Sequence, residues 1–157
     1  MSPGLERPPD RWARSRVHTT HKAPTAFALL HPLSRRMKFL PLGDTDGIGA
    51  SCHYLDLNGT GLVLDAGTDP QRSGTDSLPR FNWVNERADG YVDHALITHA
   101  HHDHMGGLPV LVQHFPHVMA HMTDATKRLL SFLLPSSARL QQKRLDRGET
   151  TEPPLFT

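Results

Sequence analysis

A cluster of histidine and aspartate side chains directly follows a short apolar run near the middle of the chain. The apolar run, Ala95–Ile97, has the length and composition of a buried β-strand. The polar residues behind it are His99, His101, His102, Asp103 and His104. Neutral imidazole nitrogen and carboxylate oxygen are ligands that zinc accepts. The sequence therefore predicts a metal site where the chain leaves this strand.

The spacing of these residues indicates how they divide between metal ions. His99 and His101 are two positions apart, so both rings point to the same side of an extended backbone. Asp103 and His104 follow in what we expect to be a curled loop, where they present a second pair of donors. We therefore expect two adjacent metal positions. His102 faces away from its neighbours in this arrangement and is expected to be solvated.

Histidine runs also have simpler explanations, because they occur in surface loops, purification tags and low-complexity tracts that sequester metal. This run is different: it is internal, Asp103 interrupts it, and a Gly106-Gly107 turn closes it. A helix is predicted after the turn, over Leu108–Phe115. A strand, a polar loop and a helix in this order favour a metal site of catalytic type.

The His-x-His-x-Asp-His pattern at residues 99–104 resembles the signature of the metallo-β-lactamase superfamily of metal-dependent hydrolases. With the flanking Gly106-Gly107-Leu108-Pro109, it looks like the ribonuclease branches, namely the β-CASP nucleases and, less closely, the tRNA 3′-processing enzymes. Segments 64–67 and 119–127 are also similar to segments of those branches. The resemblance covers residues 37–157, and the central motif is its specific part.

The resemblance implies an α/β fold, namely the N-terminal half of an αββα sandwich in which two β-sheets pack face to face. It also implies two zinc ions, the first bound by His99 and His101 and the second by Asp103 and His104. Asp103 would have a catalytic role as well, by orienting the attacking water. Asp65 ends an apolar strand, where a turn-capping role is common. The resemblance instead implies that the Asp65 carboxylate orients the metal-binding loop.

The implied activity is metal-dependent hydrolysis, and the ribonuclease-like flank favours a phosphodiester bond of RNA as the substrate. Zinc in such enzymes activates water and neutralises charge on phosphorus. Two alternatives stay open. One is a hydrolase of the same superfamily that acts on a thioester, a lactone or a β-lactam. The other is an inactive fragment that binds metal weakly or not at all.

Composition limits the cellular environment of the protein. One cysteine, Cys52, excludes an internal disulfide and fits a reducing cytoplasm. No apolar run approaches the roughly 20 residues that a membrane-spanning helix needs. The histidine enrichment is confined to one region, residues 94–121. His114, His117 and His121 form no compact motif there, and we expect them at the surface or at strand ends.

The first 36 residues differ in composition from the rest of the chain. They hold seven Lys or Arg residues against two acidic ones, are rich in proline, and carry no helical apolar stripe. We expect residues 1–36 to form a disordered basic extension and residues 37–157 to form the domain. Because Met37 opens a stretch typical of the start of the resembled family, an over-long start assignment is one explanation of the extension.

Further strands follow from alternation and turn signals. They are expected over residues 38–42, 52–57, 61–65 and 117–120. Pro41 indicates that the first of them lies at a sheet edge. Asn58-Gly59 predicts a tight hairpin between the second and the third. The glycine-rich residues 43–50 lack the lysine and hydroxyl of a phosphate-binding loop, so we expect no such loop there.

Helices are expected around residues 83–88 and after residue 123. Thr123 is the predicted N-cap of a helix that ends at Leu134, because Pro135 is expected to stop it. Ser136 is then expected to cap another helix that runs to about Arg147. The basic residues of both helices are expected to form a solvated face.

The chain stops before the last ligands that the resembled family carries, namely two further histidines and a metal-bridging aspartate. We therefore expect it to be the first half of a longer hydrolase, with two ligands at each zinc position instead of the usual three. A strand face that the other half covers would be exposed, which favours oligomers or poor solubility. We expect no ribonuclease activity from this chain alone.

Overall fold

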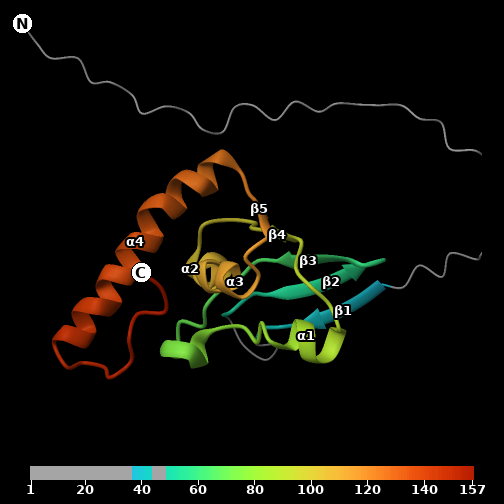
Figure 1. Cartoon of the computed structure of the whole chain (residues 1–157). Coiled ribbons are helices and arrows are strands. Elements are labelled where there is room, and N and C mark those ends of the chain that lie inside the picture. Colours follow the sequence, from blue (N-terminus) through green and yellow to red (C-terminus); the bar gives the residue numbers. More distant parts are fainter. Residues whose placement is uncertain (1–36, 44–48) are drawn as a thin grey trace, which may run out of the picture. The chain divides into compact units, whose positions relative to one another are not determined.

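The computed structural model describes residues 37–43 and 49–157 (Figure 1). The extension expected over residues 1–36 lies outside the described residues, and so does most of the glycine-rich loop. The described residues form a mixed α/β structure around one five-stranded sheet. The expected α/β class is confirmed.

The sheet has its strands in the order in which they occur in the chain. They are β1 (Met37–Pro41), β2 (His53–Leu57), β3 (Thr60–Leu64), β4 (His94–Leu96) and β5 (Met119–His121). β1, β2 and β3 pair antiparallel, whereas β3, β4 and β5 pair parallel. Each strand begins and ends within two residues of its predicted range.

Local turn chemistry explains the antiparallel part of the sheet. Asn58 and Gly59 both have positive φ, 58° and 89°, as a two-residue type I′ hairpin requires. The Gly59 N–H also donates to the Asp56 carboxylate at 2.6 Å. β1 is an outermost strand of the described sheet, so the edge position predicted from Pro41 is confirmed.

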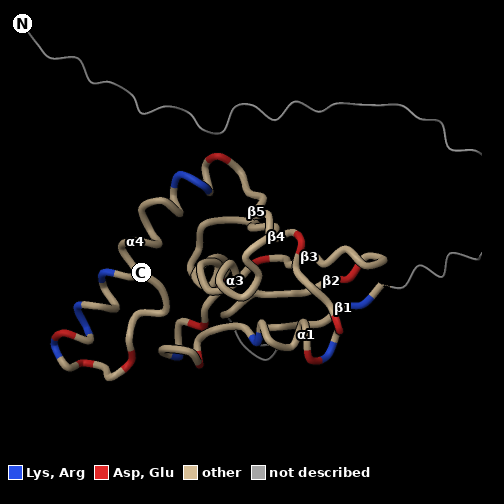
Figure 2. The backbone as a smooth tube through the Cα atoms, in the orientation of Figure 1, with Lys and Arg blue, Asp and Glu red and all other residues tan. Residues whose placement is uncertain are grey.

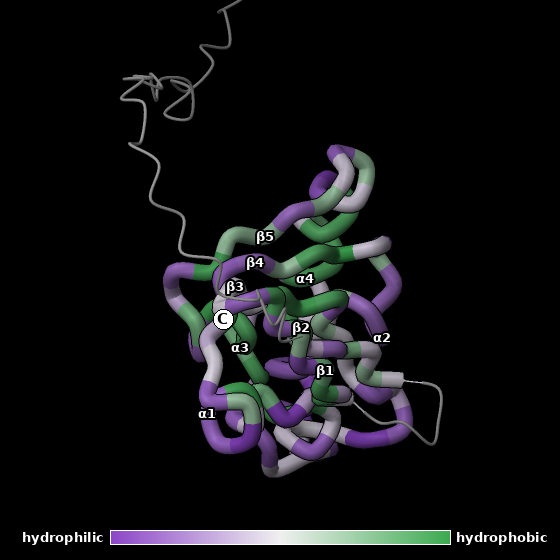
Figure 3. Tube along the Cα trace, turned by 90° about the vertical axis from the view of Figure 1, so that its right-hand side faces the viewer, coloured by the Kyte–Doolittle hydropathy of each residue, from purple (hydrophilic) through white to green (hydrophobic). Residues whose placement is uncertain are grey.

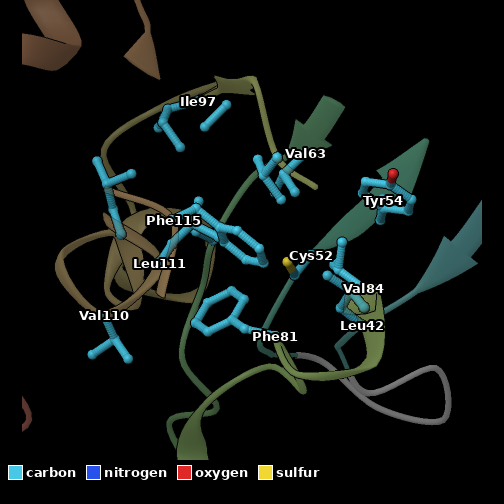
Figure 4. Close-up of a cluster of buried hydrophobic side chains, with 14 of the residues drawn as sticks. Leu42, Cys52, Tyr54, Val63, Phe81, Val84, Ile97, Val110, Leu111 and Phe115 are labelled. Atoms are coloured by element: carbon cyan, nitrogen blue, oxygen red, sulfur yellow. The ribbon is translucent and has the colours of Figure 1, made fainter. Parts of the chain in front are cut away.

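Helices cover one face of the sheet. Tyr54, Val63 and Ala95 lie opposite one another on β2, β3 and β4, and all three are buried. They form a single hydrophobic cluster with side chains of α1 (Trp83–Ala88) and α3 (Leu108–His114), part of which is drawn in Figure 4. Because each large buried apolar side chain contributes about 1.5–3 kcal/mol, this cluster fixes both helices on the sheet. Segment 68–93 contributes four side chains that lie in or against it: Leu78, Phe81, Trp83 and Val84.

The other face of the sheet carries apolar side chains that the described residues leave uncovered. Phe39 on β1 and Met119 on β5 are 59% and 58% exposed. Leu55 and Leu62 lie in register between these two edges and are half-buried. Hydrophobic residues therefore occur on both faces of the central strand β3, which is largely coloured as hydrophobic in Figure 3. An open apolar strand face is therefore present in the described part of the chain.

α4 (Asp124–Asp146) is longer than the sequence predicted. Thr123 caps it as predicted, since its hydroxyl accepts a hydrogen bond from the Thr126 N–H. The prediction that Pro135 ends the helix and that Ser136 begins another is wrong, because one helix continues through both residues. A proline inside a helix removes one backbone hydrogen bond and costs about 3 kcal/mol.

Contacts on both sides of Pro135 offset that cost. Leu130 is buried one turn before it. After it, the Ser136 hydroxyl donates to a backbone carbonyl of the preceding turn, and the Gln141 side chain accepts from the Leu155 N–H at 2.8 Å. The basic residues of α4 are exposed along it, as predicted (Figure 2).

Two short elements complete the described structure. η1 (Gly74–Ser77) is a single 3-10 turn, and α2 (His102–Met105) is a four-residue helix inside the metal-binding motif. Among the residues described, no helix combines the length and the apolar character that crossing a membrane requires.

Candidate metal centre

The carboxyl ends of two parallel strands bring the candidate site together. Leu64 at the end of β3 lies in register with Leu96 at the end of β4. The Asp65 N–H continues this pairing by donating to the Leu96 carbonyl at 2.9 Å. Asp65 and Thr98 therefore emerge side by side at one edge of the sheet. Ligand sites of sheets with parallel strands commonly lie at this edge.

Backbone hydrogen bonds then join the segment after β3 to α2. The Ala66 N–H donates to the His104 carbonyl at 2.8 Å, and the Thr68 N–H donates to the His102 carbonyl at 3.1 Å. Between them, Gly67 lies so close to Asp103 that a Cβ atom would overlap the Asp103 carbonyl. Only glycine allows this approach. Asp103 and His104 were expected in a loop, but they lie in α2, where the Met105 N–H donates to the His101 carbonyl at 3.0 Å.

Three of the predicted ligands form one cluster of rings. Nε2 of His99 lies 3.1 Å from Nδ1 of His101, so the two rings share a side as predicted. The ring of His104 lies 4.1 Å from the ring of His99, measured between centroids. Nε2 of His104 is 3.6 Å from the nearer carboxylate oxygen of Asp103. The structure thus brings together all four residues that the sequence proposed as ligands.

The Asp65 carboxylate is hydrogen-bonded to this cluster through His104. Its Oδ2 accepts a hydrogen bond of 2.8 Å from Nδ1 of His104. Its Oδ1 accepts from the Thr98 N–H at 2.8 Å, and the Thr98 hydroxyl donates to the same carboxylate at 3.0 Å. Asp65 is buried and has a positive φ of 58°, a conformation that aspartate tolerates better than most residues. Asp65 thus contacts both His104 and Thr98.

Thr98 connects Asp65 to His99. The sequence did not predict this contact. The Thr98 hydroxyl oxygen lies 2.9 Å from Nδ1 of His99. Because the single hydroxyl proton goes to Asp65, the Nδ1–H of His99 must be the donor in this contact. His99 and His104 therefore carry their protons on Nδ1, which leaves the lone pair of each Nε2 free for a ligand bond.

His102 is exposed, in keeping with the prediction that it is solvated, and it has one further contact. Its Nε2 lies 3.4 Å from the Ser137 hydroxyl on α4. Partial burial lowers the pKa of His102, and the negative charge of Asp103 opposes that shift. The neutral ring is therefore a contact between α2 and α4.

The remaining histidines predicted outside the motif stay outside the cluster. His117 is exposed, and Nδ1 of His114 lies 3.1 Å from the Val110 carbonyl of its own helix. His121 contacts His94 on the neighbouring strand. The one thiol is excluded as well, because burial raises the pKa of Cys52 and the nearby charge of Asp65 raises it further. A buried neutral thiol is not a metal ligand.

The donor chemistry and spacing of the cluster fit zinc. Two nitrogens on one tetrahedral zinc ion, each at about 2.0–2.1 Å, lie about 3.3–3.4 Å apart. His99 and His101 present nitrogens 3.1 Å apart, so a small ring rotation reaches that spacing. Within residues 37–43 and 49–157, no group of three or more His, Cys, Asp or Glu side chains is arranged to hold an ion. The cluster therefore offers zinc two pairs of donors, His99 with His101 and Asp103 with His104.

Sequence comparison agrees with the geometry of the motif. Residues 45–155 match a family model described as the metallo-beta-lactamase superfamily. The chain belongs to the metallo-beta-lactamase superfamily. The matched range contains Asp65 and the whole of the motif at residues 99–104. The family resemblance inferred from that motif is thereby confirmed.

Relatives within the metallo-beta-lactamase superfamily include proteins named for RNA processing. Endoribonuclease YSH1 of Kluyveromyces lactis is 36% identical over 104 residues, which are 66% of this chain and 13% of the relative. Cleavage and polyadenylation specificity factor subunit 3-I of Arabidopsis thaliana is 31% identical over 115 residues, 71% of this chain and 16% of the relative. The chain thus spans less than a fifth of the length of these relatives.

Solved structures with a similar arrangement are more distant in sequence. One is described as a new diphosphatase from the PhnP family. It is 16% identical and has a TM-score of 0.45. The match covers 64% of this chain and 47% of the diphosphatase chain.

Proposed function

We propose that the protein is a metal-dependent hydrolase that cleaves phosphodiester bonds in RNA at the His99–His104 motif. The observation that carries the proposal is the ring cluster of His99, His101 and His104, with Asp103 beside it and Asp65 behind it. Sequence relatives named as endoribonucleases support RNA as the substrate. RNA processing takes place inside the cell, and we propose the cytoplasm as the compartment.

The proposal assigns two zinc ions to the four side chains. His99 and His101 hold the first ion through the nitrogens that already face each other. Asp103 and His104 hold the second, and the Asp65 carboxylate keeps Nε2 of His104 unprotonated for that bond. Zinc bound there supplies Lewis-acid activation of water and neutralises charge that develops on the phosphodiester.

Asp103 has an additional role in this proposal. Its side chain is 30% exposed, so a water molecule can reach its carboxylate. A carboxylate only accepts hydrogen bonds, and it therefore turns a water O–H toward itself and the oxygen lone pair away. A water oriented in this way faces an RNA phosphate bound over the cluster. Asp103 can also take up the proton that the attacking water loses.

The test is cleavage of a single-stranded RNA by the zinc-loaded protein translated from the complete reading frame. We expect cleavage that a chelator stops and that His101→Ala reduces to background. His114→Ala, which removes a histidine outside the cluster, should cleave as fast as the parent. A chromogenic β-lactam, a thioester and a lactone are assayed in parallel. Hydrolysis of one of these, with no RNA cleavage, would overturn the proposed substrate.

A further inference from the structure

A second pair of histidines lies on the sheet, away from the motif. His94 is on β4 and His121 is on β5, two strands that run parallel and side by side (Figures 1 and 3). Leu96 lies in register with His121. His94 is two residues before Leu96. Because side chains of a strand alternate between the two faces of a sheet, His94, Leu96 and His121 lie on the same face.

The two rings are in direct contact. Nδ1 of His94 and Nε2 of His121 are 3.0 Å apart, and the ring centroids are 5.1 Å apart with planes inclined at 55°. Among the described residues, His121 is exposed and His94 is half-buried. Unlike His104, neither ring has a contact with a carboxylate in the described structure.

We propose that His94 and His121 form a two-histidine site for a divalent transition-metal ion, separate from the centre at the motif. Imidazole suits zinc, copper and nickel. Two nitrogens on one tetrahedral ion lie about 3.3–3.4 Å apart. The observed 3.0 Å requires the rings to separate by only a few tenths of an ångström. Water molecules complete the coordination shell on the exposed side.

The backbone supports this site as well as the side chains do. The two histidines belong to paired strands. A further backbone hydrogen bond, from the Ile97 N–H to the His121 carbonyl at 2.9 Å, extends the pairing beyond β4. The rings are thus presented by a rigid scaffold, so little freedom is lost when both bind one ion. The site does not depend on the proposed hydrolase activity.

A zinc titration followed through the imidazole NMR signals of the full chain tests the proposal. Each signal is identified by its loss in the corresponding alanine variant. We expect the His94 and His121 signals to shift together and to saturate at one ion per pair. His94→Ala should weaken zinc binding at His121 by at least about tenfold, because a two-point attachment becomes a single one. His117→Ala, which removes an exposed histidine outside the pair, should change nothing.

Two results would overturn the proposal. One is a His121 signal that does not move at zinc concentrations that saturate the His99 and His101 signals in the same tube. The other is unchanged zinc affinity at His121 after His94→Ala. If His94→Ala alters the backbone amide spectrum, His94→Gln keeps the size of the side chain on β4, and the same weakening of zinc binding at His121 is expected from it.

Discussion

Asp65 and His104 are joined by a hydrogen bond of 2.8 Å between Oδ2 and Nδ1. They are far apart in the chain, and the register of β3 with β4 makes the contact. Because a carboxylate accepts, His104 must carry its proton on Nδ1 and offer the lone pair of Nε2. The same carboxylate reaches His99 through the Thr98 hydroxyl. One buried acid thus contacts His104 directly and His99 through Thr98, and these contacts favour the tautomer with the proton on Nδ1 in both rings.

Asp65→Asn should lower zinc affinity at the motif about 10- to 100-fold. The amide group of asparagine donates where Asp65 accepts, so Nδ1 of His104 becomes the acceptor and its proton moves to Nε2, where it blocks the ligand bond. Zinc titration against a chelating indicator measures the change. Asp69→Asn is the matched control, because Asp69 is also a buried acid but pairs with Arg72. Equal zinc affinities of the parent and of Asp65→Asn would contradict the orienting role and leave Asp65 with a turn-capping role only.

Thr98→Val should weaken zinc binding about tenfold, within the range for residues behind metal ligands. Valine keeps the shape of threonine but removes the hydroxyl that accepts from His99, so the proton of His99 is free to move to Nε2. Thr68→Val is the control, since that hydroxyl has one long contact of 3.3 Å, to the His102 carbonyl. The same loss of affinity from both variants would show that the effect is not specific to His99.

His101→Ala and His102→Ala should differ sharply although the residues are neighbours. His101 faces His99 at 3.1 Å, so its loss should abolish zinc uptake at that position. His102 points toward Ser137 on α4, and its loss should leave zinc uptake unchanged. Zinc content per chain after dialysis measures both. Equal losses would mean that the ring directions are assigned wrongly.

Pro135→Ala should raise the free energy of unfolding by about 2 kcal/mol. Alanine restores the missing N–H in α4 and removes a cost of about 3 kcal/mol, while the unfolded chain gains up to about 1 kcal/mol of backbone freedom. Urea denaturation with an unchanged m-value measures the gain. Ala138→Gly, in the same helix, should lower stability by about 1 kcal/mol. A destabilised Pro135→Ala would show that the proline fits the helix without strain.

Features set by neighbouring residues were predictable from the sequence. The Asn58-Gly59 turn, the edge strand at Pro41 and the Thr123 cap depend on φ preferences and on single hydrogen bonds. The shared side of His99 and His101 belongs to the same class, because residues two positions apart on an extended chain point to the same side.

Features set by distant segments were not predictable in this way. α2, which contains Asp103 and His104, is held in place by backbone bonds from Ala66 and Thr68. α4 runs through Pro135, with Leu130 buried before the proline and Gln141 hydrogen-bonded to the Leu155 N–H after it. Thr98 was overlooked because its role requires Asp65, and only the strand register brings those two together. Sequence reading located the motif, whereas the residues that orient it depend on long-range pairing.

The most direct measurement is an anomalous difference map recorded at the zinc edge from crystals of the protein grown with zinc. The proposed centre predicts a strong peak bonded to His99 and His101, at about 2.0–2.1 Å from each nitrogen. The same map should show a second peak beside Asp103 and His104. Full zinc occupancy elsewhere on the chain, with no peak at His99 and His101, would contradict the assignment of the motif as a metal centre.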